Sequence, residues 1–60
     1  MNPTKLQSEV ANKLTNNNTS LKWNGIYGFY SNGDVVINVY WNFDKETTYN
    51  ITIKSNGMYY

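Results

Sequence analysis

The sequence predicts a small α+β domain in which one N-terminal helix packs on an antiparallel β-meander of three to four strands (α-β-β-β, two layers). Two observations carry this prediction. The tripeptide Ser-Asn-Gly occurs at residues 31–33 and again at residues 55–57, each time between runs rich in Tyr, Trp, Val and Ile, and Asn-Gly in such a setting signals a hairpin. Residues 6–14 instead carry apolar side chains at helical spacing. We therefore expect a single domain over residues 1–60.

The N-terminal segment is expected to form a helix from about Pro3 to Asn16. Asn2 is a good N-cap residue, and proline is tolerated at the first helical position. Asn tolerates the left-handed conformation that follows a last helical turn, so the run Asn16 to Asn18 should end the helix. The apolar side chains recur every fourth residue and should pack on the sheet. They are Leu6, Val10 and Leu14.

Three later segments have the composition of strands. Residues 35–43 and 47–55 alternate between large apolar and mostly polar side chains, so their odd-numbered residues should face the helix. The segment 44–46 breaks this pattern and is expected to form the turn between them. Residues 21–30 alternate less clearly, and Gly25 and Gly28 are expected to mark a bulge or to relieve crowding beside aromatic side chains.

The two Ser-Asn-Gly loops should set the strand register. A three-residue loop with its glycine at positive φ pairs Tyr30 with Asp34 and keeps the large apolar groups on one face. The cross-strand neighbours expected from this register are Phe29 and Val35, Tyr27 and Ile37, Trp23 and Trp41, and Ile53 and Tyr59. Alanine at Gly33 or Gly57 should destabilise the fold, less so at Gly57 because the strand after it is short.

Composition limits the kind of protein this is. A chain of 60 residues has a marginal core. It has no Cys and no His, so it can build no disulfide and no zinc or haem site from those ligands. Self-association or close aromatic packing is then the expected stabilising element. The N-terminus lacks the apolar centre of a signal peptide and no stretch is long enough to span a membrane, so we expect a cytoplasmic protein without membrane contact.

No residue pattern indicates catalysis, a cofactor or a metal. The four carboxylates lie on the expected solvent side of the helix or in and beside turns, and nothing indicates that two of them converge. A nucleophile without His would need a lysine or terminal amine as its base. We therefore expect a non-enzymatic protein that binds another macromolecule.

Two surfaces are candidates for that binding. The outward face of the sheet should carry Tyr and Met side chains, which are enriched at protein interfaces; the alternative is an ordinary solvated sheet face. The residues expected to bind a partner there are Ile26, Tyr30, Val36, Asn38, Tyr40, Met58 and Tyr60. The other candidate is apolar surface that one helix is too narrow to cover, together with the free, uncharged edge of residues 25–30. The residues expected to support a homodimer are Trp23, Tyr27, Trp41 and Phe43.

In its size, its lack of catalytic groups and its use of Lys and Asn without Arg, the chain resembles the small accessory proteins of phages of A/T-rich bacteria. The resemblance is one of size and composition and assigns no site residue. Many such proteins inhibit a host enzyme or a host anti-phage defence system by stoichiometric binding. The resemblance therefore implies an inhibitor that acts in the host cytoplasm.

Two other functions remain open at this point. The first is a small nucleic-acid-binding protein that stacks bases on a Tyr-rich sheet, although the five lysines are scattered rather than clustered. The second is a structural subunit that assembles with itself. Binding to phosphates weakens steeply with salt, whereas an uncharged protein interface does not, so salt dependence separates the first function from protein binding.

Overall fold

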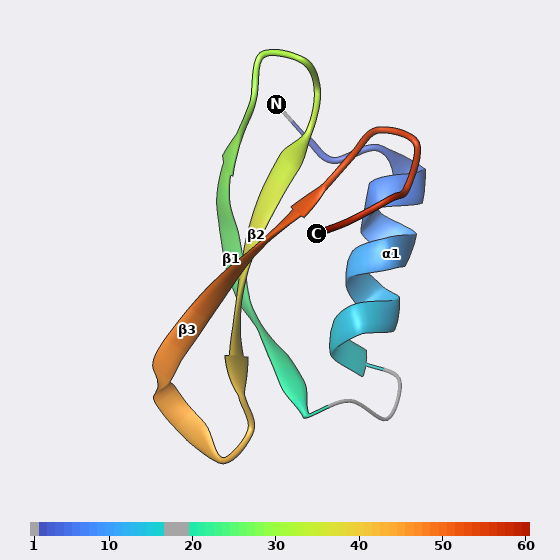
Figure 1. Ribbon diagram of the computed structural model, residues 1–60. Coiled ribbons are helices and arrows are strands. Elements are labelled where there is room, and N and C mark those ends of the chain that lie inside the picture. Colours follow the sequence, from blue (N-terminus) through green and yellow to red (C-terminus); the bar gives the residue numbers. More distant parts are fainter. Residues whose placement is uncertain (1, 17–19) are drawn as a thin grey trace.

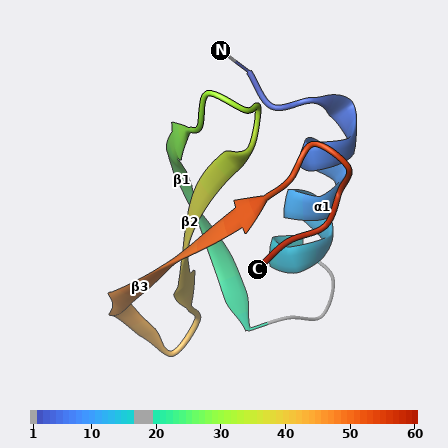
Figure 2. The same ribbon diagram turned by 45° about the horizontal axis from the view of Figure 1, so that its top comes forward.

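The computed structural model describes residues 2–16 and 20–60 and confirms the α+β fold. Helix α1 (Lys5–Asn16) is followed by three antiparallel strands, β1 (Leu21–Phe29), β2 (Val35–Trp41) and β3 (Asp44–Ile53), in the spatial order β1-β2-β3. The helix lies along one side of the twisted sheet (Figure 1), and the view from a second direction gives the same two layers (Figure 2). Asn17 and Asn18, which we expected to help end the helix, lie outside the described residues.

The helix begins at Lys5, two residues later than expected. Thr4 is the N-cap residue, because its carbonyl oxygen accepts the first helical bond from Ser8 N at 2.9 Å. Gln7 N donates to Thr4 Oγ1 at 3.1 Å, and Thr4 N donates to Gln7 Oε1 at 2.9 Å. This reciprocal pair is a capping box. The prediction of Asn2 as the N-cap is therefore wrong, and Pro3 precedes the helix rather than opening it.

The buried face of α1 also differs from the predicted one. The buried helix residues are Gln7, Ala11 and Thr15. Leu6, Val10 and Leu14 lie one position earlier on the helix, and none of them is fully buried. The helix is thus rotated by about 100°, the angle of one residue. The small side chain of Ala11 faces the sheet. The side-chain amide of Gln7 donates hydrogen bonds to the backbone oxygens of Gly33 and Ile53.

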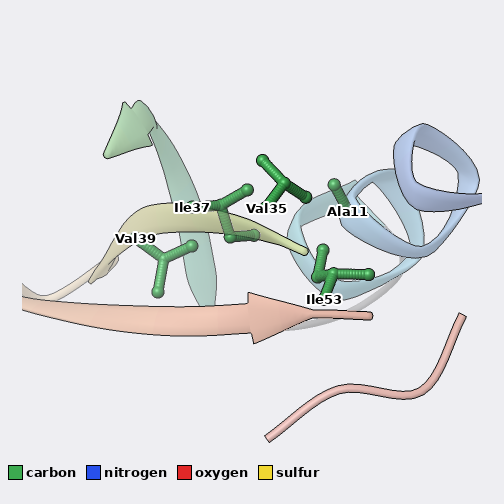
Figure 3. Close-up of a cluster of buried hydrophobic side chains, with 5 residues drawn as sticks. All are labelled: Ala11, Val35, Ile37, Val39 and Ile53. Carbon is green, nitrogen blue, oxygen red and sulfur yellow. The ribbon is translucent and has the colours of Figure 1, made fainter. Parts of the chain in front are cut away.

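The core is formed where α1 meets the middle and last strands. Figure 3 shows the five side chains of this cluster, which come from α1, β2 and β3. They are Ala11, Val35, Ile37, Val39 and Ile53. The strand members are all odd-numbered, as the alternation predicted, and strand geometry directs the even-numbered residues of β2 to the opposite face.

Both Ser-Asn-Gly loops adopt the predicted geometry. In the first loop Tyr30 N donates to Asp34 O at 2.9 Å, and Gly33 has a φ of 95°. The second loop repeats this arrangement, with Lys54 N donating to Met58 O at 2.7 Å and Gly57 at a φ of 91°. The predicted pairs Phe29 with Val35 and Ile53 with Tyr59 are confirmed. Thr52 and Tyr60 exchange two backbone hydrogen bonds beyond that bridge, so the C-terminus adds a short segment to the β3 edge.

Strand β1 departs from the predicted register because it contains two irregularities, between Trp23 and Gly25 and between Ile26 and Gly28. Each adds one residue to β1 relative to β2. Ile26 therefore pairs with Ile37, in place of Tyr27. In the N-terminal part of β1, Trp23 pairs with Val39 and Leu21 pairs with Trp41. The predicted pairs Tyr27 with Ile37 and Trp23 with Trp41 are wrong for this reason.

The β2–β3 connection is tighter than predicted. Trp41 pairs directly with Asp44, so the turn consists of Asn42 and Phe43 rather than residues 44–46. Between the pairs Tyr40–Thr48 and Trp41–Asp44, β3 contains three extra residues, 45–47. The Asp44 carboxylate organises this wide bulge by accepting hydrogen bonds from Glu46 N at 3.2 Å and Thr47 Oγ1 at 2.7 Å.

Candidate binding surfaces

The outer face, by which we mean the sheet face away from α1, is covered by no helix or strand among the described residues. Register places three pairs of β2 and β3 residues on it, and the residues of each pair lie side by side. They are Val36 with Thr52, Asn38 with Asn50, and Tyr40 with Thr48. Tyr60 lies beside Thr52 at the edge of β3 through their two backbone hydrogen bonds.

A ladder of three asparagine side chains crosses the outer face. Asn24 Nδ2 donates to Asn38 Oδ1 at 2.6 Å, and Asn38 Nδ2 donates to Asn50 Oδ1 at 2.8 Å. The three residues come from β1, β2 and β3 in turn. Asn24 takes part because it is the extra residue of the first β1 bulge. The ladder holds the three amides in defined orientations on a surface that solvent reaches.

Most of the residues predicted to bind a partner do lie near this face. Tyr30, Met58 and Tyr60 are exposed, whereas Asn38 and Tyr40 are partly buried. Val36 keeps only 7% of its surface exposed, so little of its side chain is accessible to a partner. Ile26 does not belong to the outer face, because the second β1 bulge pairs it with Ile37 of the core. The predicted placement of Ile26 on the outer face is therefore wrong.

A groove of about 430 Å³ runs between α1 and β1. Its floor includes Val35 and Ile37 of β2, and Trp23 and Ile26 line it from β1. The helix contributes a wall of small and uncharged residues. They are Gln7, Ser8, Ala11, Asn12, Thr15 and Asn16, with Pro3 before the helix. Trp23 and Ile26 remain 46% and 44% exposed, so the groove is open to solvent on the β1 side.

The hairpin between β2 and β3 carries an aromatic cluster, which we call the aromatic end. The rings of Trp41 and Phe43 stack with centroids 5.8 Å apart, and Trp41 meets Tyr49 edge to face at 5.9 Å. Phe43 is nevertheless 81% exposed at the tip of the turn. Such ring pairs contribute about 0.5–1.5 kcal/mol beyond the area they bury, so the cluster is held together without being covered.

Three of the four residues predicted to support a dimer, Trp23, Trp41 and Phe43, lie along the groove or at the aromatic end. Tyr27 does not join them. It is the extra residue of the second β1 bulge, and 71% of its surface is exposed. The bulges also interrupt the free edge of β1, which makes that edge a poorer template for another strand. Gly25 and Gly28 had indicated a bulge, but the alternation alone did not show how it would shift the faces.

Two of the carboxylates, those of Asp34 and Asp44, serve local structure. Asp34 is buried, its Oδ2 accepts a hydrogen bond from Asn32 Nδ2 at 3.3 Å, and Asp44 holds the β3 bulge as described above. Among the described residues, no group of three or more Asp or Glu side chains is placed to hold a metal ion. Within the same residues, no helix has the length and apolar character needed to cross a membrane.

No known protein family, curated protein or solved structure matches this chain. The function is therefore inferred from the surfaces of the molecule itself.

Proposed function

We propose that the protein is a non-enzymatic protein-binding module that contacts its partner through the outer face. The observation that carries this proposal is the asparagine ladder Asn24–Asn38–Asn50 on a sheet face that no described element covers. Tyr and Asn are the residues that antibody paratopes favour, because Tyr offers large contact area at low entropic cost and Asn offers adaptable hydrogen bonds. The exposed rings of Tyr30 and Tyr60 extend the same surface.

The biological role that we propose is stoichiometric inhibition of a host enzyme or host anti-phage defence system in the host cytoplasm. This part rests on the resemblance in size and composition to small phage accessory proteins. A chain of 60 residues without Cys or His can act on a larger enzyme by occupying its surface. It needs no chemistry of its own for this purpose.

We further propose that the protein functions as a homodimer. The apolar groove and the aromatic end both remain open in the single chain, and exposed apolar patches of this kind mark interaction sites. A second copy would supply the additional burial that a small domain without disulfides requires. The outer face of each copy would then stay available for the foreign partner.

The test of the binding face is affinity capture from a host lysate with quantitative mass spectrometry. Tyr40→Ala and Tyr60→Ala, both on the outer face, should reduce capture of the specific partner at least about tenfold, as hot-spot tyrosines do. Tyr59→Ala is the matched control, because Tyr59 is an exposed tyrosine that pairs with the core residue Ile53 and so lies on the helix side of the sheet. Its capture should equal that of the unmodified chain. Equal losses in all three folded variants would place the interface elsewhere.

The same capture experiment distinguishes protein binding from nucleic-acid binding and from self-assembly. A protein partner should remain bound after nuclease treatment and in about 1 M salt, where the Debye length is ~3 Å. Capture that disappears under these conditions would instead indicate phosphate contacts and a nucleic-acid partner. A chain that retains only copies of itself would indicate a structural subunit.

A further inference from the structure

The α1–β1 groove and the aromatic end are linked by one row of paired residues on the helix side of the sheet. Trp23, Val39 and Tyr49 occupy neighbouring positions in one row across the three strands. Trp23 lines the groove, and Tyr49 contacts Trp41 of the aromatic end. This row therefore connects the two ends. Val39 is 0% exposed and adds no open surface to this row. The surface that we call the inner strip therefore consists of Trp23, Ile26, Trp41, Phe43 and Tyr49.

The chemistry of the groove selects an uncharged, apolar occupant. The described residues that line it include no charged side chain. Its most deeply buried polar groups already have partners, because Gln7 Nε2 donates to Gly33 O and Ile53 O, and Thr15 Oγ1 donates to Ala11 O. A charged group entering the groove would lose water without meeting an opposite charge among these residues. An aromatic or aliphatic side chain has no such penalty.

The chain itself carries such a group. Phe43 is the most exposed large hydrophobic residue of the described chain, and it sits in a two-residue turn where a neighbour can reach it. An aromatic side chain buries about 150–250 Å² when it is covered. Multiplied by the exposed fractions of Phe43, Trp23 and Tyr49, this gives on the order of 350 Å² of exposed aromatic surface. Ile26 and Trp41 add further exposed apolar area.

That area is close to what a dimer of this size needs. A standard interface buries about 800 Å² on each partner, and in homodimers about 65% of it is apolar. The inner strip thus supplies most of the apolar part, and the uncharged helix wall beside it can supply the polar rim. A second copy is the one occupant for which the chain supplies both halves of the contact.

Symmetry then fixes how two copies meet. A two-fold interface is isologous, so if residue i of one copy contacts residue j of the other, j also contacts i. Phe43 lies in the turn beyond the end of β2 at Trp41, and the row of Trp23 lies between that turn and Ile37 of the groove. A two-fold axis through that row turns the aromatic end of each copy over the groove of the other.

We propose that the protein dimerises through the inner strip with Phe43 of each copy inserted into the α1–β1 groove of its partner. This inference deepens the proposed homodimer and rests on it. It assigns the groove to a second copy and Phe43 to the anchoring role. It leaves the outer faces on the two outside surfaces of the dimer.

Cross-linking between two different single-cysteine variants tests this geometry, because the natural chain has no cysteine. Asn42→Cys places a thiol beside Phe43, and Ser8→Cys places one on the groove wall. A short bis-maleimide should join the two variants to each other when they are mixed, and should join either variant to itself far less. Thr48→Cys on the outer face is the matched control and should give no cross-link with Asn42→Cys.

The anchoring role is tested separately by sedimentation equilibrium. Phe43→Ala should weaken dimerisation at least about tenfold while the circular dichroism spectrum stays unchanged, because Phe43 is mostly exposed in the single chain. Tyr27→Ala should leave the dimer intact. Preferential Asn42→Cys self-linking in an intact dimer would overturn the insertion geometry alone. A folded monomer at every concentration tested would overturn the homodimer as well, without affecting capture through the outer face.

Discussion

The Gln7 side-chain amide donates a hydrogen bond to the backbone carbonyl of Ile53 at 3.1 Å, and with its second hydrogen it donates to Gly33 O at 2.9 Å. A single helical residue thus joins the β1–β2 loop to the end of β3. Its Oε1 caps the first turn of the helix at the same time. Gln7 is 1% exposed, so these bonds form away from water. The orientation of α1 on the sheet follows from satisfying them.

Gln7→Ala should destabilise the protein by about 2–4 kcal/mol, because it leaves buried carbonyl oxygens without donors and removes half of the capping box. Gln7→Glu should have a similar effect at neutral pH, since an ionised carboxylate accepts but cannot donate. Urea denaturation measures both. Asn12→Ala, at an exposed position of the same helix, should change stability by less than about 0.5 kcal/mol. A Gln7→Ala loss no greater than that of the control would contradict this role.

Gly57→Ala should be more destabilising than Gly33→Ala, which reverses the order expected from the sequence. Both residues have positive φ, which adds about 1–2 kcal/mol for a residue with a Cβ. At Gly33 the new Cβ would meet open space, whereas at Gly57 it would lie 3.2 Å from Leu6 Cγ and Cδ2. Thermal unfolding of the two variants measures the difference. In the Leu6→Ala background that difference should shrink, and a difference of the same size there would exclude Leu6 as its cause.

Ile26 and Tyr27 should differ sharply in their sensitivity to substitution. Ile26 pairs with the core residue Ile37, so Ile26→Thr should destabilise the fold by roughly 1 kcal/mol through lost apolar burial. Tyr27→Thr should be within about 0.5 kcal/mol of the unmodified chain, because Tyr27 is largely exposed. Chemical denaturation of the two threonine variants decides between the observed register and the one without bulges. The opposite ranking would support the register in which Tyr27 faces Ile37.

The asparagine ladder should contribute measurably to stability despite its exposure. Asn38→Asp keeps the acceptor for Asn24 but loses both donated bonds, to Asn50 Oδ1 and to Tyr49 O. We expect a loss of about 0.5–1.5 kcal/mol. A double-mutant cycle between Asn24→Ala and Asn38→Ala should give a coupling energy of about 0.5 kcal/mol or more. Strict additivity would show that the two amides act independently in solution.

Local signals in the sequence were sufficient for the order of elements and for both hairpin loops. Ser-Asn-Gly determines its own turn, because glycine alone accepts the positive φ at low cost and the asparagine side chain bonds the backbone two residues on. In both loops that bond is present, from Asp34 N to Asn32 Oδ1 and from Met58 N to Asn56 Oδ1, at 3.0 Å in each case. The alternation of β2 likewise placed Val35, Ile37 and Val39 on the core face, since strand geometry fixes which side chains share a face. It did not show that Val36, on the opposite face, is buried as well.

Other features were readable from the sequence but required a choice between competing signals. Thr4 and Gln7 match a capping box, yet Asn2 followed by Pro3 is also an acceptable helix start. The stripe of Leu6, Val10 and Leu14 favoured one helix face on apolar grounds. The folded helix turns a neighbouring face inward, because buried carbonyl oxygens need the Gln7 donors and Ala11 allows close approach. Hydrophobic periodicity contains no information about that need.

The two binding surfaces were decided only by tertiary structure. Gly25 and Gly28 indicated that β1 was irregular, but the number and position of its bulges depend on how its side chains fit against β2 and α1. Each bulge exchanges the faces of the residues beyond it. The pair of bulges brings Ile26 into the groove, leaves Tyr27 outside the core and sets Asn24 beside Asn38. A one-residue change in register is a small local difference in the sequence pattern, yet it determines which side chains share a surface.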